Sequence, residues 1–589
     1  MPVESGVRGY RQLAEFLSPF KAPLVFALIL TGCLTVIGMV APLLMRRLIN
    51  DVAREGNWDI FPMLMGLMFA VPLLRAVVNI GTSITLNQIN LGIIGRTRKR
   101  IFHHLMRLSM DSYSQMPVGG MQQRLMGDVA TLSGVATGGI ISLLADGVAV
   151  VFAVVVMLRL SLPLSMLTFA LLPAYFLNYW FFSKRIRTAT ALLRSRMDHI
   201  SSTLQERLSA HELIQSYGQD RAEATHFTSQ ARQVMDAAIR GSVYSTSFNH
   251  LATVINQVGN TLIFCAGAYM VIQEQMGYGD VVAFCAYATN ILGPVTRFAG
   301  VSNQLVQAGV SADRINELMH REPAIRESED PEHVETLEGD IRLDAVTFSY
   351  PEGRPALHEV TLSIPAGTHV AVVGAKGAGR STLAMLLRRF YDPQEGLIAV
   401  DGTDIRRYHL REYRRAMAMV RPESAIFDGS IADNLRYGKP DVSDERMIEV
   451  SRALGLDEFV SELHDGYGTL VGTGGLQLST GVRQKIGMAR ALIADPLMLI
   501  LDEAVAALDA ESAETAIQAV LDAMDGRTCI IVINRVLMAR GTDRVVVMER
   551  GRVAQIGEHA ELLVQAGSIY RDLFASQYGR DRLPPLSEE

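Results

Sequence analysis

The chain has 589 residues, 49% of them hydrophobic, and a formal net charge of −6 at pH 7. This length leaves room for several domains, and the apolar content is high for a soluble protein. The negative charge gives no reason to expect nucleic-acid binding, and the four cysteines lack the spacing of a metal site or a disulfide framework.

The first half of the chain contains six apolar stretches, each close to the ~20 residues that a bilayer core requires. They are residues 22–44, 60–80, 138–158, 162–182, 251–272 and 281–302. Buried helices of a soluble protein are the alternative, but six such stretches within roughly 300 residues favour membrane spans. The sequence therefore predicts a membrane domain of six transmembrane helices.

Basic residues indicate the orientation of these spans. Arginine and lysine are concentrated in residues 96–124 and 184–207, which places the segments after the second and fourth spans in the cytosol. Only the first external loop, with the arginines of residues 46–54, goes against this rule. Residues 1–19 are charged and mixed, unlike a cleavable signal. We therefore expect a multi-pass protein of the cytoplasmic (inner) membrane, with both termini in the cytosol.

The two long cytoplasmic segments are rich in helix formers and should prolong the membrane helices. At 1.5 Å per residue, ~25 extra residues would extend a helix nearly 40 Å beyond the bilayer, far enough to touch a cytosolic domain. Residues 117–120 and 216–220 break the helical pattern and are predicted to form the distal turns.

The composition changes after the sixth span. We predict a transmembrane domain over residues 1–316 and an acidic, proline-containing linker over residues 317–338. Residues 339–589 alternate strand-like and helix-like segments, which is typical of an α/β domain with a mainly parallel sheet.

In that domain, residues 374–381 match the phosphate-binding loop G-x-x-x-x-G-K-[ST], except that Arg380 replaces the lysine. The loop follows an apolar strand-like run, so its backbone N–H groups and the start of the next helix are expected to hold phosphate. The Ser381 hydroxyl is a candidate Mg²⁺ ligand. Arg380 keeps the charge, but its planar fork does not replace a compact ammonium between two phosphates. A functionless glycine-rich turn is the alternative.

Residues 497–504, LMLILDEA, form a hydrophobic strand that ends in two carboxylates. Asp502 is a candidate Mg²⁺ ligand, and Glu503 could orient the attacking water or accept its proton. An apolar strand ending in Asp-Glu is common in α/β proteins. Its occurrence together with the phosphate loop favours the functional interpretation.

These motifs resemble those of a half-transporter of the ATP-binding cassette (ABC) superfamily, in which a six-helix exporter domain is fused to one nucleotide-binding domain. The order also agrees: LSTGV at 478–482 resembles the signature sequence, and AALD at 506–509 resembles the D-loop. The resemblance implies ATP and Mg²⁺ as cofactors. The implied nucleotide contacts are Tyr350, Gly374, Ala375, Lys376, Gly377, Ala378, Gly379, Arg380, Ser381, Thr382, Ser479, Gly481 and Asp509. Residues 117–125 and 211–223 resemble the family's two intracellular loops, where we place the coupling helices.

Four positions besides Arg380 depart from the family pattern. Pro422 stands where the family has a glutamine, and proline offers no side-chain oxygen. Asn534 replaces the histidine that contacts the γ-phosphate. In the signature, Thr480 and Val482 replace a glycine and a glutamine. These changes predict a degenerate site that holds Mg-ATP and turns it over slowly.

In this family each of two nucleotide sites combines motifs from both subunits, so a homodimer would duplicate the defect. We therefore expect a heterodimeric ATP-dependent translocase in which a second half-transporter supplies a working site. The cargo would be an amphipathic small molecule, lipid, peptide or siderophore, with export favoured. The alternatives are a non-hydrolysing regulatory subunit and an importer of siderophores, because the fold does not fix direction.

Three charged residues within the predicted spans are candidates for a substrate cavity, because charge is costly in lipid. They are Arg75, Asp146 and Arg297. An intramembrane ion pair is the alternative role for each of them. Nearby asparagines and tyrosines could bind cargo or join helices to one another.

Overall fold

A computed structural model of the chain describes residues 20–350, 353, 355–473 and 475–584. It divides into two compact units. The first comprises the chain up to Met106 together with Val118–His320, and the second comprises Arg107–Pro117 together with Arg321–Glu589. Each unit is described separately below.

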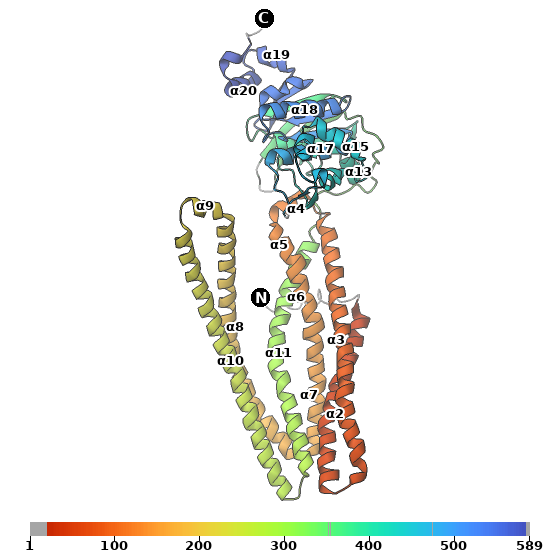
Figure 1. Ribbon diagram of the computed structural model, residues 1–589, viewed down its shortest axis with the longest axis vertical. Coiled ribbons are helices and arrows are strands. Elements are labelled where there is room, and N and C mark those ends of the chain that lie inside the picture. The colour runs from red at the N-terminus through yellow and green to blue at the C-terminus, as the bar shows by residue number, and fades with distance from the viewer. Residues whose placement is uncertain (1–19, 351–352, 354, 474, 585–589) are drawn as a thin grey trace. The chain divides into compact units, whose positions relative to one another are not determined.

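The first unit consists of long helices (Figure 1). Its α-helices are α2 (Lys21–Arg47), α3 (Phe61–Leu105), α5 (Val118–Gln123), α6 (Val129–Gly134), α7 (Ile140–Leu160), α8 (Leu162–Ser209), α9 (His211–Ser216), α10 (Asp220–Ile272) and α11 (Tyr278–Met319). Wider π-helical turns lie at Leu48–Arg54, Arg124–Asp128 and Val135–Gly139. The last two join α5, α6 and α7 end to end.

Five helical segments within the described residues are long and apolar enough to cross a membrane. They contain the first five predicted spans, and most of their apolar surface is not buried within the chain. The sixth predicted span falls on α11, where many side chains near residues 292–300 lie outside the described part. The helical extensions beyond the bilayer are also confirmed, since α8 and α10 continue 27 residues past 182 and 31 residues before 251, respectively.

Helices α8 and α10 form a hairpin with α9 at its tip (Figure 1). Side chains of α8 bond to backbone carbonyls of α10: the Asn178 amide donates to Phe248 O over 3.2 Å, and the Tyr175 hydroxyl donates to Ala252 O over 3.3 Å. These bonds satisfy polar groups at membrane depth and fix the register of the two helices. Asn178 therefore joins helices to one another.

The second unit is an α/β domain. Its principal sheet has the order β12-β11-β3-β10-β9-β6, parallel except for β12, and a second, antiparallel sheet has the order β2-β1-β4-β5. The strands of the two sheets are β1 (Ile341–Ser349), β2 (Pro355–Ile364), β3 (His369–Gly374), β4 (Glu395–Val400), β5 (Thr403–Asp404), β6 (Met417–Val420), β9 (Met498–Asp502), β10 (Thr528–Val532), β11 (Arg544–Glu549) and β12 (Arg552–Gly557). This arrangement confirms the predicted mainly parallel sheet. A short ribbon pairs β7 (Gly429–Ser430) with β8 (Leu470–Val471).

Helices pack on both sides of the principal sheet and close an apolar core. The α-helices from Arg321 onward are α12 (Arg380–Leu387), α13 (Leu410–Ala416), α14 (Ile431–Leu435), α15 (Asp444–Ala453), α16 (Asp457–Ser461), α17 (Thr480–Ile493), α18 (Ala510–Ala523), α19 (His559–Val564) and α20 (Ile569–Tyr578). Strand β10 consists entirely of buried residues because it lies inside the sheet, covered on both faces.

The short helix α4 (Met110–Gln115) belongs to the second unit, although α3 and α5 on either side of it in the chain belong to the first. The Ala324 N–H donates to Ser109 Oγ over 3.2 Å, which ties the start of α4 to the α/β domain. The predicted coupling segments, residues 117–125 and 211–223, contain the short helices α5 and α9. Their coupling role stays a prediction.

Candidate functional site

The order of the principal sheet determines where the predicted nucleotide motifs meet. β10 lies between β3 and β9, with Val532 opposite Val372 on one side and Asp502 on the other. Because the strands are parallel, the segments that follow β3, β9 and β10 emerge at one edge of the sheet. The phosphate loop, the Asp-Glu pair and Asn534 are therefore brought together.

The backbone of the phosphate loop requires glycine at two positions. Gly374 has φ +156°, and a Cβ there would lie 2.3 Å from Met548 O. Gly379 has φ +97°, and a Cβ there would lie 2.7 Å from Ala356 O. Gly379 is also the N-cap of α12, so the free N–H groups of this helix begin at the loop. The local backbone is therefore that of a phosphate cradle.

The other predicted loop residues complete this cradle. The Ala378 N–H donates to Ala375 O over 3.1 Å, which tightens the turn. Gly377 has φ +85° with open space around it, and Lys376 is exposed.

Ser381 and Asp502 form the candidate Mg²⁺ site. The Ser381 hydroxyl donates to Asp502 Oδ1 over 2.8 Å, and Asp502 is 2% exposed. Burial raises the pKa of the Asp502 carboxyl, and the hydrogen bond from Ser381 opposes that shift. Mg²⁺ usually takes one or two protein oxygens together with phosphate and water. The donor set fits that ion.

The guanidinium of Arg380 is held by the protein itself. Nη1 donates to Ile533 O over 2.5 Å, and Nη2 donates to Asn534 Oδ1 over 2.5 Å and to Glu503 Oε1 over 3.1 Å. Arg380 is only 6% exposed, and its burial lowers the pKa of the guanidinium although the two carboxylates beside it oppose that shift. The cation that replaces the lysine therefore binds the candidate catalytic carboxylate.

Glu503 and Asn534 share this network. Glu503 adopts φ +50°, a left-handed conformation, and its N–H donates to Val532 O over 3.0 Å. A non-glycine residue in this conformation is held by its surroundings. Glu503, which the sequence predicted to act on water, and Asn534, at the position of the family's histidine, thus both accept a hydrogen bond from Arg380.

Tyr350 lies beside the start of α12. Its hydroxyl is 3.1 Å from Thr382 Oγ1, and its ring packs edge-on against Phe348 and Tyr391. Tyr350, which the resemblance implies as a nucleotide contact, is thereby placed next to the helix that follows the phosphate loop.

Pro422 occupies its predicted place on the segment after β6, where its carbonyl accepts a hydrogen bond from Gln484 Nε2 over 3.2 Å. Gln484 Oε1 in turn accepts from the Ala507 N–H over 3.1 Å. Gln484 is 2% exposed and joins the position of the missing glutamine to the D-loop. Sequence analysis missed it, although a polar residue on the buried face of α17 was a usable signal.

Arg421, the residue before Pro422, was also missed. Its charge is among the influences that lower the pKa of Asp502 against the larger effect of burial. A cation therefore lies near the candidate Mg²⁺ site, within the segment where the family has its glutamine.

The signature and D-loop residues lie together on α17 and α18. Ser479 is the N-cap of α17 and accepts from the Val482 N–H over 3.3 Å, and Asp509 is the N-cap of α18 and accepts from the Ser512 N–H over 2.9 Å. A Cβ on Gly481 would lie 3.1 Å from Leu508 Cδ2. In the described part of the chain, Ser479 makes no hydrogen bond to the loop of residues 374–382. That the signature residues of one subunit meet the phosphate loop of the other stays a prediction.

Two of the three charged residues of the membrane helices have side chains within the described part of the structure. Asp146 lines an apolar cavity of about 740 Å³ with Tyr175 and Tyr179. The guanidinium carbon of Arg75 instead lies 3.2 Å from where a Cβ on Gly38 would be, so it packs against α2. The side chain of Arg297 lies outside the described part.

Comparisons with known proteins agree with this architecture. Residues 24–295 match the family model of the ABC transporter transmembrane region, and residues 357–506 match that of the ABC transporter ATP-binding domain. The ABC transporter ATP-binding protein YknV of Bacillus subtilis (strain 168) is 32% identical over 96% of this chain and 94% of its own length. The chain therefore belongs to the ABC transporter family: it is a membrane protein with an exporter-type helical domain and an ATP-binding domain, and its class is that of an ATP-dependent translocase.

Two further relatives cover nearly the whole chain. The ATP-dependent lipid A-core flippase of Sodalis glossinidius (strain morsitans) is 29% identical over 97% of this chain and 98% of its own length. The structure of a bacterial Atm1-family ABC exporter with ATP bound superimposes with a TM-score of 0.80 at 22% identity, covering 95% of this chain and 99% of that one. This structural likeness concerns the fold alone.

Proposed function

We propose that this chain is one half of a heterodimeric ABC exporter whose own nucleotide site binds Mg-ATP and hydrolyses it slowly. The observation that carries the proposal is the Arg380 network, in which the cation at the lysine position bonds to Glu503, Asn534 and Ile533 O. Mg²⁺, held by Ser381 and Asp502, would neutralise phosphate charge when bound.

Binding and hydrolysis depend on different atoms of this site. Backbone N–H groups of residues 374–379 and the start of α12 attract phosphate without using any side chain that has changed. Hydrolysis requires Glu503 to act on water, yet Glu503 accepts a charge-assisted bond from Arg380, and Asn534 is engaged by the same guanidinium. If each of three altered positions lowers transition-state stabilisation by ~2 kcal/mol, the rate falls by several orders of magnitude.

This defect implies that the transporter contains a second, different half-transporter. Two copies of the present chain would place the same altered residues in both nucleotide sites. We infer a partner with an unaltered lysine, glutamine and histidine, whose site this chain completes with Ser479, Gly481 and Asp509. The domain boundaries at 316 and 338, the cytosolic position of the ATP-binding domain and the inner-membrane location belong to the same proposal.

The ATPase activity of the purified chain, alone and with its partner half-transporter, tests the proposal. We expect slow turnover by the chain alone and fast turnover by the pair. Glu503→Gln should leave the rate of the pair within about twofold, whereas the matching substitution in the partner should reduce it by on the order of 10³. Fast turnover by the chain alone, or loss of activity in the pair with Glu503→Gln, would contradict the proposal.

A regulatory subunit that never hydrolyses ATP is the second candidate, and the Arg380–Glu503 bond favours it. A single-turnover measurement separates the two. ATP bound at the site of this chain, in a pair whose partner glutamate is substituted, should be hydrolysed over minutes to hours if the site is slow, and should remain intact if it is regulatory.

We propose an amphipathic cargo, with export as the direction. The cavity of Asp146, Tyr175 and Tyr179 combines an apolar wall with a few polar groups, and one full-length relative is named as a lipid A-core flippase. Uptake of lipid and peptide probes by inside-out vesicles, compared with right-side-out vesicles, would test both cargo and direction.

A further inference from the structure

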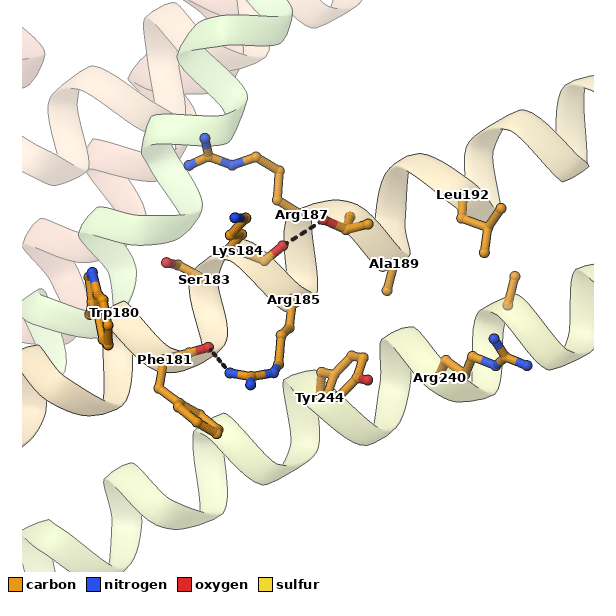
Figure 2. A pocket seen from close by; sticks show the side chains of 12 residues that line it. Trp180, Phe181, Ser183, Lys184, Arg185, Arg187, Ala189, Leu192, Arg240 and Tyr244 are labelled. Atoms are coloured by element: carbon orange, nitrogen blue, oxygen red, sulfur yellow. Dashed lines mark hydrogen bonds between the residues drawn. The ribbon is translucent and has the colours of Figure 1, made fainter.

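The arginines of this chain differ in what holds them. On α8, Arg185 is held by its own helix: its guanidinium lies 3.8 Å from the centre of the Phe181 ring, and its Nη1 donates to Phe181 O over 2.7 Å (Figure 2). Arg380 instead bonds to a distant segment, since its acceptor Asn534 Oδ1 lies 154 positions away in the chain. The position of Arg380 therefore depends on what holds the segment of residues 533–536.

This segment follows strand β10 and leads into the short 3-10 helix Val536–Gly541. At its start the Ile533 N–H still bonds to the sheet, donating to Val372 O over 3.1 Å. Beyond Ile533 the chain is irregular until the 3-10 helix begins, so its backbone groups need partners outside the sheet. The place of Asn534 is therefore set by those other partners.

One side chain of the C-terminal helix α20 supplies these partners. Gln577 Nε2 donates to Asn534 O over 2.7 Å, and Gln577 Oε1 accepts from the Val536 N–H over 3.0 Å. A single planar amide thus joins two backbone groups that lie two residues apart. Gln577 holds Asn534 by its carbonyl oxygen, while the side-chain oxygen of Asn534 holds Arg380.

Two other contacts hold the same segment. The Tyr570 hydroxyl donates to Val536 O over 3.3 Å, and Arg535 Nη2 donates to Leu508 O over 3.3 Å. Tyr570 is 0% exposed and belongs to the apolar core, whereas Gln577 is exposed. Helix α20 is therefore anchored by buried residues, and replacing the exposed Gln577 should leave the fold intact.

The amide of Asn534 can be oriented in one way only. A guanidinium has donors and no acceptor, so the atom that faces Arg380 must be Oδ1. The Nδ2 group at the other end of the amide remains a donor, and Asn534 is exposed. The family has its γ-phosphate histidine at this position, so Nδ2 is available to the one phosphate that distinguishes ATP from ADP.

We propose that Gln577 is a positioning residue through which this site discriminates ATP from ADP. It holds the backbone of Asn534 so that Oδ1 stays on Arg380 and Nδ2 is presented to a γ-phosphate. The backbone N–H groups of residues 374–379 serve the phosphates that both nucleotides share, so ADP binding should not depend on Gln577. This role rests on the proposed function, because it requires that the loop binds Mg-nucleotide.

Competition binding to the full-length chain in nanodiscs tests this role. Mant-ADP, a fluorescent ADP analogue, is bound in the presence of Mg²⁺ and displaced either by ADP or by AMP-PNP, which carries a γ-phosphoryl group and resists hydrolysis. We expect the parent to prefer AMP-PNP roughly tenfold, because a charge-assisted hydrogen bond distinguishes the two nucleotides. Gln577→Met should reduce this preference to less than about threefold and keep the ADP affinity within about twofold.

The matched control is Gln565→Met, which replaces an exposed glutamine at the end of the neighbouring helix α19. It should keep the preference of the parent. If Gln577→Met also keeps it, or if the parent binds both nucleotides equally well, Gln577 does not have this role. A parent that binds neither nucleotide would contradict the proposed function as well.

A double-mutant cycle shows whether Gln577 acts through Asn534. Asn534→Ala removes the amide that Gln577 positions, and it should lower the preference for AMP-PNP as far as Gln577→Met does. Adding Gln577→Met to Asn534→Ala should then change the preference by less than about twofold. If the two losses multiply instead, Gln577 acts independently of Asn534 and the proposal is wrong.

A second substitution keeps the test valid if Gln577→Met does not fold. Gln577→Glu retains an acceptor for the Val536 N–H, but the ionised carboxylate cannot donate to Asn534 O. It should lose the preference for AMP-PNP as Gln577→Met does, while its Tm stays within about 2 °C of the parent. Retention of the full preference by Gln577→Glu would show that the bond to Asn534 O does not position the amide.

Discussion

The loop from Gly374 to Gly379 and the cluster around Arg380 adjoin one another, yet they depend on different parts of the polypeptide. The loop is shaped by backbone conformation and by glycines whose replacement would collide with Met548 O or Ala356 O. The cluster is made of side chains, and there the sequence has changed at the lysine, glutamine and histidine positions of the family. The proposed function therefore assumes that phosphate binding by the backbone survives such changes, whereas hydrolysis, which depends on side chains, becomes slow.

Removing a required glycine should have the largest effect on this comparison. Gly379→Ala places a Cβ 2.7 Å from Ala356 O at φ +97°, whereas Gly377→Ala has open space at φ +85°. We expect Gly379→Ala to lower ATP affinity by on the order of 100-fold or more. Gly377→Ala should lower it by less than about tenfold, because the added Cβ causes backbone strain but no collision. Equilibrium binding of a fluorescent ATP analogue measures both. Equal losses would show that the loop is not held by these packing contacts.

Restoring the altered side chains should have the next largest effect. Arg380→Lys would free Glu503 and Asn534 from the guanidinium, and adding Asn534→His and Pro422→Gln would return donors and acceptors to the site. We expect the triple variant to hydrolyse ATP at least about 100-fold faster than the parent, and Arg380→Lys alone no more than about tenfold faster. The measurement is steady-state ATPase of the chain alone. The matched control is Lys439→Arg, at an exposed lysine of the ATP-binding domain outside the implied nucleotide contacts, which should leave the rate unchanged.

If the restored variant remains slow while ATP binding is intact, the slow rate does not originate in these three positions. The altered signature at Thr480 and Val482 would then be the next part of the site to restore, because Thr480 adds a side chain at the N-terminus of α17.

A smaller effect is expected at Gln484, which joins the position of the missing glutamine to the D-loop. Gln484 joins Pro422 O to the Ala507 N–H from a buried position. Gln484→Leu leaves both backbone groups without this partner and should lower the free energy of unfolding of the ATP-binding domain by about 1–3 kcal/mol. Thermal unfolding measures the change. Gln477→Leu, at an exposed position of the same segment, should leave the Tm within about 1 °C.

The smallest effect is expected from Asp502, and it depends on pH. Burial raises the pKa of the folded-state carboxyl above its ordinary value, so the folded state binds the proton more tightly than the unfolded state does. Ionised Asp502 therefore costs stability above its folded-state pKa, and the cost disappears as the pH falls through that pKa. Without nucleotide or Mg²⁺, Asp502→Asn should raise the Tm by ~2–4 °C at pH 7.

The difference in Tm between Asp502→Asn and the parent should shrink as the pH is lowered. Added Mg-ATP should reverse its sign at pH 7, because only the parent retains the carboxylate for the ion. If the difference in Tm stays constant with pH, the burial of ionised Asp502 does not destabilise the folded protein.

The sequence by itself determined the six apolar spans, the α/β domain and the spacing of the phosphate loop and the Asp-Glu pair. These features are encoded locally, in hydrophobic periodicity and in glycines at fixed offsets. It also showed that Arg380 replaces a lysine. It did not show that the guanidinium binds Glu503 and Asn534, because that contact requires β10 to lie between β3 and β9.

Tertiary structure alone decided the remaining contacts. Gln484 bridges residues 62 and 23 positions away, and Asn178 and Tyr175 bond to α10 across 70 and 77 positions. Helix α4 likewise belongs to the α/β unit, although it follows α3 and precedes α5 in the chain and both of these belong to the other unit. Contacts between distant segments depend on strand order and helix register, and neither is contained in a local sequence pattern.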